Sequence, residues 1–323
     1  MQKTTHMPVL SDLLVYKLSP GGNTTLLVHD NTLRPRPDTP AATHLRAALA
    51  VRLMRDGKHA DVEQVGFLDT TGHAASKKDA TDAASLPAYP HMEMMGGEFC
   101  VNACRSAALV FALTRLLPKT ACNEDGVPIL WAGHMTTSGL DAPLPVRVCV
   151  EQGNATTPES AYEAAVALPF HTGEGQITEL APGKTLIRLP GITHLLLDTT
   201  RFPQPEDPLY ASAAFRREHM LEACEAAGVI WYAPGPDNTP AITPVVWVQG
   251  TNSTILETAC GSGSLALALQ CAPNATETAP FIVRQPSGDS FAIWFTQEDT
   301  PLAWINGPVR LLEQSMISVD SDS

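Results

Sequence analysis

Two stretches of the chain that are apolar on nearly every side place the strongest constraint on the fold. Their composition predicts helices over Val101–Leu117 and Gly261–Cys271, and neither stretch has a polar face that water could cover. A helix that is hydrophobic all round must be enclosed on every side. Each of these helices is therefore expected to run through the middle of a curved sheet.

Both apolar stretches begin directly after a cysteine, which indicates an internal repeat. Cys100 and Cys260 stand 160 residues apart in a chain of 323 residues. A glutamate lies just upstream of each cysteine, Glu98 in one case and Glu257 in the other. The sequence therefore predicts two related half-chains, each with a cysteine at a helix start.

A second repeated motif supports this division, because PGGNTTLLVHD near the N-terminus resembles PGITHLLLDT near the middle of the chain. We place the boundary near residue 170, which divides the chain into residues 1–170 and 171–323. The predicted class is α+β, with two pseudo-symmetric domains. Each domain is expected to be a curled mixed β-sheet or barrel around its central apolar helix, and the last strand can pack on the N-terminal half.

Short β-branched or alternating runs predict the strands of both halves. The 27 prolines fit a chain with many turns between strands. An amphipathic helix is also expected within residues 207–228, ending at Gly228, because glycine is a common residue after a helix C-terminus.

Composition and charge exclude several classes of protein. The chain is 44% hydrophobic and 17% charged, as in globular proteins, and its net charge of -13 argues against binding to nucleic acid or to an anionic membrane. We expect no signal peptide and no membrane span. The seven cysteines form no Cys-x-x-Cys pair and the ten histidines are scattered. We therefore expect free thiols, a cytoplasmic location and no metal site.

A cysteine at a helix start is in a position to do chemistry. The unpaired N–H groups of the first helical turn bind carboxylates, and the positive end of the helix dipole lowers the pKa of a thiol there. The expected carboxylate-binding N–H groups are those of Val101, Asn102, Gly261 and Ser262. If both helices point into one cleft, they can hold one carboxylate between two sulfur atoms.

That arrangement predicts inversion of an amino-acid stereocentre. One thiolate removes the α-proton from one face, and the opposite thiol returns a proton to the other face. The N–H groups stabilise the charge that develops on the carboxylate. Cys100 and Cys260 are the predicted acid/base pair, and the reaction needs neither pyridoxal phosphate nor a metal.

Five motifs in the same order resemble the diaminopimelate epimerase family, whose members are cofactor-independent racemases built from two similar halves. PGGNTTLLVHD resembles the family's Gly-Asn motif at Asn23, and VEQVGFL resembles its Asp-Gln segment at Gln64. EFCVNACR and ACGSGS resemble the two cysteine motifs, at Cys100 with Asn102 and at Cys260. RQPSGDSFAIWF resembles the Gln-Pro-Gly-Gly segment. The resemblance implies an isomerase, a small amino-acid substrate and a homodimer.

Departures from the family pattern lie where its members hold the far end of diaminopimelate. The Glu-Arg-Gly run is absent, and the Gly-Asn-Pro-His motif reads GITH, which keeps His194 but puts Ile192 in the asparagine position. A substrate without a second amino-acid head fits this better. The motif wordings resemble histidine racemases that supply D-histidine for opine-type metallophores, so histidine is the predicted substrate.

Glu63, His194 and Glu257 are predicted to support catalysis, and Asn23 and Gln64 to contact substrate beside the residues named above. Simpler roles stay open: a turn for Asn23, a core position for His194, a helix cap for Glu257. Two other functions also stay open, a diaminopimelate epimerase with an altered distal pocket and a non-catalytic amino-acid-binding protein. Proline or hydroxyproline epimerase is disfavoured because the Met-Cys-Gly-His motif is missing.

Overall fold

The structure is a computed structural model in which the described strands all belong to one 16-stranded sheet. It describes residues 12–29, 40–74, 88–120, 129–150, 161–169, 176–235, 237, 239–296 and 301–318. The predicted boundary at residue 170 lies outside these residues. No helix in the described ranges is long and apolar enough to cross a membrane.

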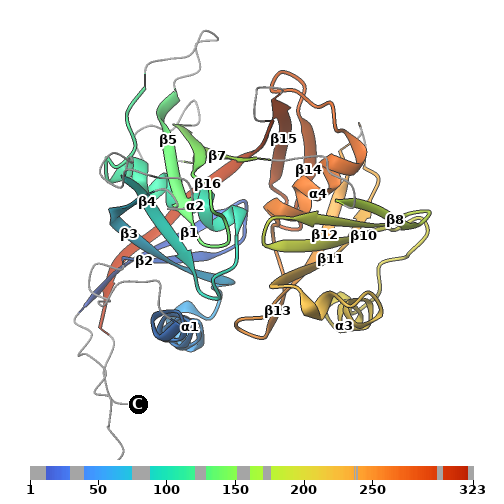
Figure 1. Cartoon of the computed structure of the whole chain (residues 1–323), viewed down its shortest axis with the longest axis horizontal. Coiled ribbons are helices and arrows are strands. Elements are labelled where there is room, and N and C mark those ends of the chain that lie inside the picture. The colour runs from blue at the N-terminus through green and yellow to red at the C-terminus, as the bar shows by residue number, and fades with distance from the viewer. Residues whose placement is uncertain are drawn as a thin grey trace, which may run out of the picture.

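The first half of the sheet closes into an eight-stranded barrel (Figure 1). Its strands follow in the order β1-β2-β3-β4-β5-β6-β7-β16, and β16 returns to pair with β1. The β2–β3 and β4–β5 pairs are parallel and the others are antiparallel. The bounds are Leu13–Pro20, Thr25–His29, Gln64–Ala74, Ala88–Met94, Ile129–Thr137, Leu144–Val150 and Ala161–Pro169 for β1 to β7, and Leu302–Ile317 for β16.

The second half is a curled sheet that stays open. From β16 its order is β15-β14-β12-β11-β10-β9-β8, with β13 paired to β12. Within the described residues, β8 pairs with β9 and with no other strand, so it forms an edge. The bounds are Ile177–Ala181, Lys184–Leu189, Ile192–Asp198, Ala226–Ala233, Ala241–Val248, Ser253–Leu256, Phe281–Arg284 and Ser290–Thr296 for β8 to β15.

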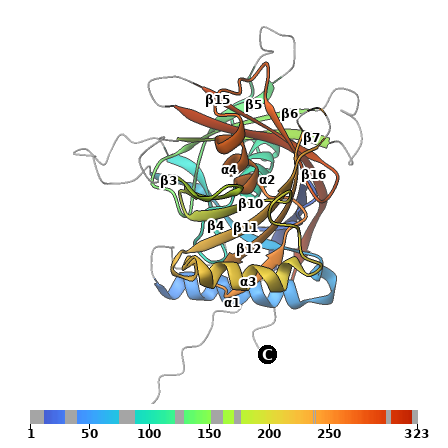
Figure 2. The ribbon, with the colours of Figure 1, turned by 90° about the vertical axis from the view of Figure 1, so that its right-hand side faces the viewer.

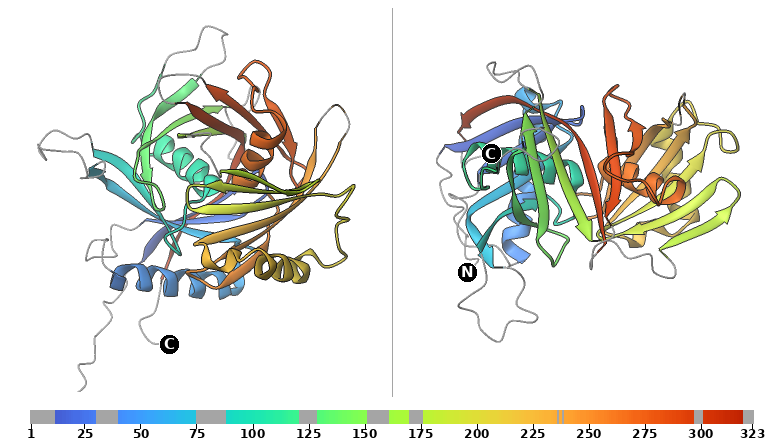
Figure 3. Two further views of the ribbon diagram at one scale, coloured as in Figure 1. Left: turned by 45° about the vertical axis from the view of Figure 1, so that its right-hand side comes forward. Right: turned by 90° about the horizontal axis from the view of Figure 1, so that it is seen from above.

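Strand β16 joins the two halves. Its first part pairs with β15 on one side and β7 on the other, and its last part pairs with β1. Seen from above, this long strand leaves the second half and runs along the barrel (Figure 3). The chain therefore completes its N-terminal barrel with residues from its C-terminal end.

The two apolar helices are surrounded by strands. Helix α2 (Val101–Leu113) contacts all eight strands of the barrel, and its first twelve residues are buried. The predicted range to Leu117 is too long, since the helix ends at Leu113. Helix α4 (Gly261–Cys271) contacts β9, β10, β15 and β16, and is buried up to Leu269. Both helices lie in the middle of the molecule when it is viewed from the side of the open half (Figure 2).

The remaining helices cover the outside. Helix α1 (Pro40–Arg55) packs on β3 and is followed by the short η2 (Gly57–His59). Helix α3 (Pro208–Glu218) packs on β11 and β12 and is followed by η3 (Leu221–Ala223).

The prediction that the helix within residues 207–228 ends at Gly228 is wrong, since α3 ends at Glu218 and Gly228 lies inside strand β11. Gly228 pairs with His194 on β10, and a Cβ atom at this position would lie 2.1 Å from His194 Nδ1. The glycine makes room for a buried ring and does not cap a helix.

Candidate active site

Both helix-start cysteines line one pocket between the two halves. The barrel contributes Glu63, Gln64, Met95 and residues 98–102. The open half contributes Ile192, Ala226, Val246, Val248, Ile255, Glu257 and residues 260–262. Of the residues predicted to act on a substrate, only Asn23 and His194 do not line this pocket.

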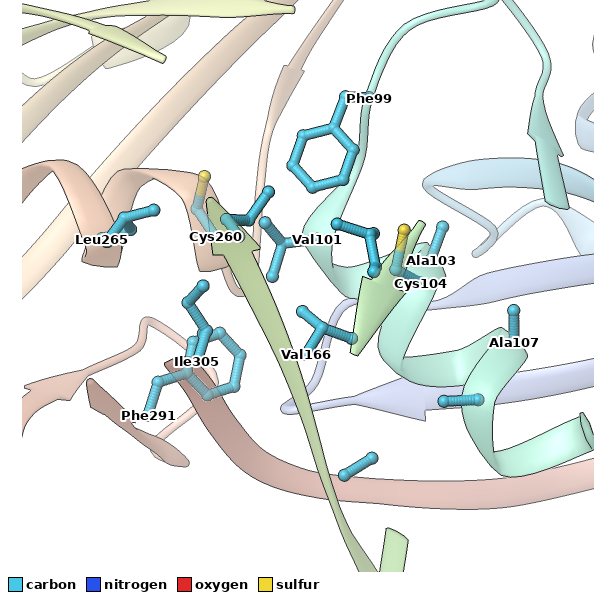
Figure 4. Close-up of a cluster of buried hydrophobic side chains, with 14 of the residues drawn as sticks. Phe99, Val101, Ala103, Cys104, Ala107, Val166, Cys260, Leu265, Phe291 and Ile305 are labelled. Carbon is cyan, nitrogen blue, oxygen red and sulfur yellow. The ribbon is translucent and has the colours of Figure 1, made fainter. Parts of the chain in front are cut away.

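The two helix starts have the same local geometry. Cys100 and Cys260 both precede their helices in extended conformation, with φ and ψ of -135° and 114° in one case and -133° and 104° in the other. The helix starts abut, because a Cβ atom at Gly261 would lie only 2.5 Å from Val101 Cγ1. Val101 and Cys260 meet here beside Phe99 (Figure 4).

The Gly-Ser-Gly sequence after Cys260 is explained by this packing. Gly261 faces Val101, and a Cβ atom at Gly263 would lie 2.2 Å from Ile230 Cδ1. The Gly263 N–H donates to the Sγ atom of Cys260 at 3.4 Å. The glycines therefore allow close approach and a sulfur-capped helix start.

Each helix start leaves two N–H groups beside the pocket without an acceptor. In α4, the Ser264 N–H donates to the Cys260 carbonyl at 3.0 Å; in α2, the Cys104 N–H donates to the Cys100 carbonyl at 3.0 Å. No described residue accepts from the N–H groups that come earlier, namely those of Val101, Asn102, Gly261 and Ser262. Unpaired N–H groups at a helix start are able to bind an anion.

Cys100 begins a chain of hydrogen bonds that runs into the barrel. Its thiol donates to Gln64 Oε1 at 2.8 Å, and Gln64 Nε2 donates to Asn23 Oδ1 at 2.5 Å and to Thr25 Oγ1 at 2.7 Å. Asn23 in turn donates to Glu63 Oε2 at 2.9 Å. Asn23 is fully buried, so it holds Gln64 and Glu63 in place from behind.

Cys260 has a different set of neighbours. Its N–H donates to Gln285 Oε1 at 2.9 Å, and Gln285 is fixed by its own donation to Ser264 Oγ at 2.9 Å. The sulfur lies 3.6 Å from Ser262 Oγ, and the side chain of Glu257 is near enough to raise the pKa of the thiol. One cysteine therefore faces a neutral amide, while the other faces a carboxyl group.

The expected fall in the pKa of the two thiols is wrong for this structure. Burial raises the pKa of Cys100 and Cys260 well above the ordinary value, and the charge of Glu257 raises both further. Burial also raises the pKa of Glu257 to about 8, although its interaction with Cys260 acts to lower it. The loss of water around the thiols and the nearby carboxylate raise the thiol pKa more than the helix dipoles lower it.

Glu63 joins the two halves beside the pocket. Its carboxylate accepts from the Thr258 hydroxyl at 2.6 Å and from the Thr258 N–H at 3.2 Å, across the boundary between the halves. It also accepts from Asn23 Nδ2 at 2.9 Å and from the Thr24 N–H at 3.4 Å. Burial raises its pKa. Four donors occupy this carboxylate, so its observed role is to bridge the halves.

Asn102 makes a second bridge. Its Nδ2 atom donates to the carbonyl of Ala259, directly before Cys260, at 2.8 Å. Arg105 is fully buried and supports it, with Nη1 3.5 Å from Asn102 Oδ1 and further bonds to the carbonyls of Ala164 and Pro308. The side chain of Asn102 therefore links the two cysteine segments and is not free to bind a ligand with its Nδ2 group.

His194 is not brought to the pocket. It is fully buried, no described residue accepts from or donates to its ring nitrogens, and burial lowers its pKa to about 3. Its neighbour Ile192, which stands in the position of the family's asparagine, does line the pocket. The imidazole ring of His194 is therefore uncharged and forms part of the core.

Sequence reasoning missed several residues that the tertiary structure brings to the site. Thr258 and Gln285 hold Glu63 and Cys260, and the wall is completed by Met95, Glu98, Phe99, Ala226, Val246, Val248 and Ile255. Two of these residues carry a local signal: Glu98 stands just upstream of Cys100, and Gln285 is the glutamine of the RQPSGDSFAIWF motif. No group of three or more metal-binding side chains gathers among the described residues.

A family model described as "Histidine racemase CntK N-terminal domain" matches residues 13–313. The chain belongs to this histidine racemase family. Like its family it is an isomerase, and its relatives support an amino-acid racemase acting on a small amino acid.

Two curated relatives are similar over nearly their whole length. Both are histidine racemases from strains of Fusobacterium nucleatum subsp. nucleatum. One is 23% identical over 304 residues, which cover 94% of this chain and 95% of the relative. The other is 24% identical over 306 residues, which cover 94% and 96%.

Solved structures of low sequence identity share the fold. A hydroxyproline epimerase from Agrobacterium vitis with bound trans-4-hydroxy-L-proline has a TM-score of 0.62 at 10% identity, with 96% of this chain and 93% of that chain covered. A probable proline racemase from Agrobacterium radiobacter K84 with bound carbonate has a TM-score of 0.60 at 12% identity, with 95% and 93% covered. These similarities concern the fold alone.

Proposed function

We propose that this isomerase is a cofactor-independent histidine racemase with a two-cysteine, two-base mechanism. The observation that carries the proposal is that Cys100 and Cys260 line one pocket at the ends of two abutting helices. The two halves act as pseudo-symmetric domains, residues 1–170 and 171–323, each presenting its sulfur from its own central helix. Closure between them excludes water and strengthens the electrostatic interactions of the site.

The α-carboxylate of the substrate binds to the N–H groups of Val101, Asn102, Gly261 and Ser262. In this position both oxygens accept from groups that have no other acceptor among the described residues. When the α-proton leaves, negative charge grows on the carboxylate, so these donors stabilise the transition state more than the ground state.

Proton transfer then runs between the two sulfurs. One cysteine as thiolate takes the α-proton, and the other as thiol gives its proton to the opposite face of the same carbon; the reverse reaction exchanges the roles. The substrate ammonium group offsets the burial that raises the pKa of both thiols. Glu257, with a pKa of about 8, is suited to exchange a proton with Cys260.

The lining residues favour histidine over diaminopimelate. They include three carboxyl groups and no Lys, Arg or His among the described residues, so a second carboxylate on the substrate would find no cation. The names of the curated relatives support the same choice. A role in metallophore synthesis, a cytoplasmic location and a homodimer stay predictions from the sequence resemblance.

Incubation of the purified chain with L-histidine in deuterium oxide tests the proposal. We expect D-histidine by chiral chromatography, deuterium at the α-carbon, and no requirement for added pyridoxal phosphate or metal. Conversion of L,L-diaminopimelate to the meso form, with histidine untouched, would favour the epimerase instead. Binding of histidine without exchange of its α-proton would favour a non-catalytic binding protein.

A further inference from the structure

Glu98 is a buried carboxyl group in the pocket wall that the proposed proton transfer does not use. It lies two residues before Cys100, lines the pocket and is 5% exposed. Burial raises its pKa to about 6, so it is mostly ionised at neutral pH. No cationic side chain of the described residues lines the pocket, and a buried carboxylate without a cation is costly. The missing partner is one that a ligand can supply.

Contacts with the chain fix the position of this carboxylate. The Gly96 N–H donates to Glu98 Oε2 at 2.9 Å, and a Cβ atom at Gly96 would lie only 2.7 Å from the same oxygen. The Ser138 hydroxyl donates to the Glu98 carbonyl at 2.8 Å and accepts from the Met94 N–H at 2.9 Å. The Gly96 contact holds one carboxylate oxygen, the Ser138 contacts fix the backbone of Glu98, and the Glu98 N–H also interacts with the carboxylate. A carboxylate has about four acceptor positions, so these donors leave capacity for a ligand.

The other two carboxyl groups of the pocket are already engaged. Glu63 accepts from four donors of the chain, and Glu257 interacts with the Cys260 thiol that takes part in the proposed proton transfer. Of the three, Glu98 has the acceptor capacity that a substrate can use.

The side chains around Glu98 indicate what shape of substrate side chain would fit beside it. The same Gly96 Cβ position lies 3.2 Å from Val248 Cγ1, so the carboxylate is beside an apolar side chain of the opposite half. Met95, Val246 and Ile255 line the same pocket. An apolar wall with one carboxylate suits a flat ring that carries an N–H group.

We infer that Glu98 is the specificity-determining residue of the site, accepting a hydrogen bond from the side-chain N–H of the substrate ring while the apolar wall packs on its faces. The inference rests on the proposed histidine racemisation. An acidic side chain would be repelled by this carboxylate, and an aliphatic one would leave it buried without a partner. A site built to accept a hydrogen bond rejects analogues that lack the donor.

The test compares wild-type enzyme with Glu98→Gln and Glu98→Leu, using exchange of the α-proton in deuterium oxide. For Glu98→Gln we expect KM for L-histidine to rise about 10- to 100-fold with a much smaller change in kcat, because a charge-assisted hydrogen bond is weakened. For Glu98→Leu we expect a gain of exchange on L-leucine relative to L-histidine. Glu179→Gln is the matched control, since Glu179 lies exposed on β8 and does not line the pocket.

A second measurement does not depend on the variants folding. Wild-type enzyme is given L-histidine and L-3-(2-thienyl)alanine, whose ring is of similar size but has no N–H group; we expect kcat/KM for the analogue to be lower by about 10-fold or more. Equal kcat/KM for the two substrates, or an unchanged KM in folded Glu98→Gln, overturns the inference while histidine racemisation stands. Failure of wild-type enzyme to exchange histidine overturns the proposed function itself.

Discussion

The closed barrel and the open half both contain a cysteine followed by an apolar helix, but the strands around the helix differ. In each, a cysteine in extended conformation starts an apolar helix. Helix α2 is surrounded by the closed barrel, whereas α4 lies against an open sheet and ends at the exposed Cys271. The geometry of the cysteine therefore follows from the helix start and does not require a closed sheet.

The two cysteines differ more in the side chains around them than in their backbone conformation. The Cys100 thiol donates to the amide oxygen of Gln64, whereas Cys260 is beside the carboxyl group of Glu257 and the hydroxyl group of Ser262. A mechanism that uses both sulfurs therefore starts from unequal partners. Variants that change one half at a time can show how far the halves are equivalent.

Replacing either helix-start cysteine tests whether both halves are needed. Cys100→Ser and Cys260→Ser are each expected to lower racemisation by about 10²- to 10⁴-fold, because a positioned acid or base is lost. The measurement is chiral chromatography of histidine after incubation. Cys104→Ala on α2 and Cys271→Ser on α4 are the matched controls, since neither residue lines the pocket. Near-normal turnover in either helix-start variant would exclude the two-base mechanism.

Glycines in the strands test how tightly each half is packed. Gly228→Ala in the open half is expected to destabilise the fold by about 1–3 kcal/mol, because the new Cβ would meet the buried His194 ring. Gly66→Ala in the barrel should cost less, since the nearest atoms, 2.9 Å and 3.2 Å away, belong to the flexible ends of Leu27 and Met92.

Denaturation in urea measures both packing variants. Gly57→Ala, where nothing lies within 4 Å of the new Cβ, is the neutral control. An equal or greater loss of stability for Gly66→Ala would mean that the barrel is the more tightly packed half.

The bridge between Glu63 and Thr258 tests the connection between the halves. Thr258→Val removes the hydroxyl donor 2.6 Å from the carboxylate, and we expect a loss of about 1–2 kcal/mol in unfolding free energy together with a higher KM. Thr243→Val is the control, because its hydroxyl binds the exposed Gln204 within the open half. Equal effects of the two variants on KM would argue that the bridge has no part in holding the pocket.

Dependence of stability on pH separates the carboxyl groups of the two halves. Glu98 and Glu257 both have folded-state pKa values above the ordinary 4.5, about 6 and about 8. The folded state holds these protons more tightly, so their stabilising contribution is present at low pH and is lost as pH rises through those values. Each lowers the unfolding free energy by at most about 1.4 kcal/mol per pH unit.

Urea denaturation from pH 5 to pH 9 measures this dependence. Glu98→Gln should flatten the curve up to about pH 6 and Glu257→Gln should flatten it up to about pH 8, since each variant removes one titrating group. A Glu257→Gln curve that matches the wild type between pH 6 and pH 8 would contradict the raised pKa.

Prediction from sequence succeeded where the signal is local and failed where individual contacts or distant neighbours decide. Burial of α2 follows from apolar residues on every face, but the expected continuation over Thr114–Leu117 is absent and the helix stops at Leu113. The backbone turns left-handed at Arg115, with φ of 63°, and the Leu116 N–H donates to the Phe111 carbonyl at 2.8 Å where the helix ends. Apolar composition therefore predicts enclosure well and helix ends poorly, because ends depend on such individual contacts.

The site shows the same division. Local residue patterns were enough to place two cysteines at the starts of enclosed helices, because burial and helix starts are encoded by neighbouring residues. Contacts between distant segments settled that β16 closes the barrel, that Thr258 meets Glu63, and that His194 packs against Gly228 away from the pocket. They also decided the pKa of the thiols, since desolvation depends on which distant segments exclude water from them.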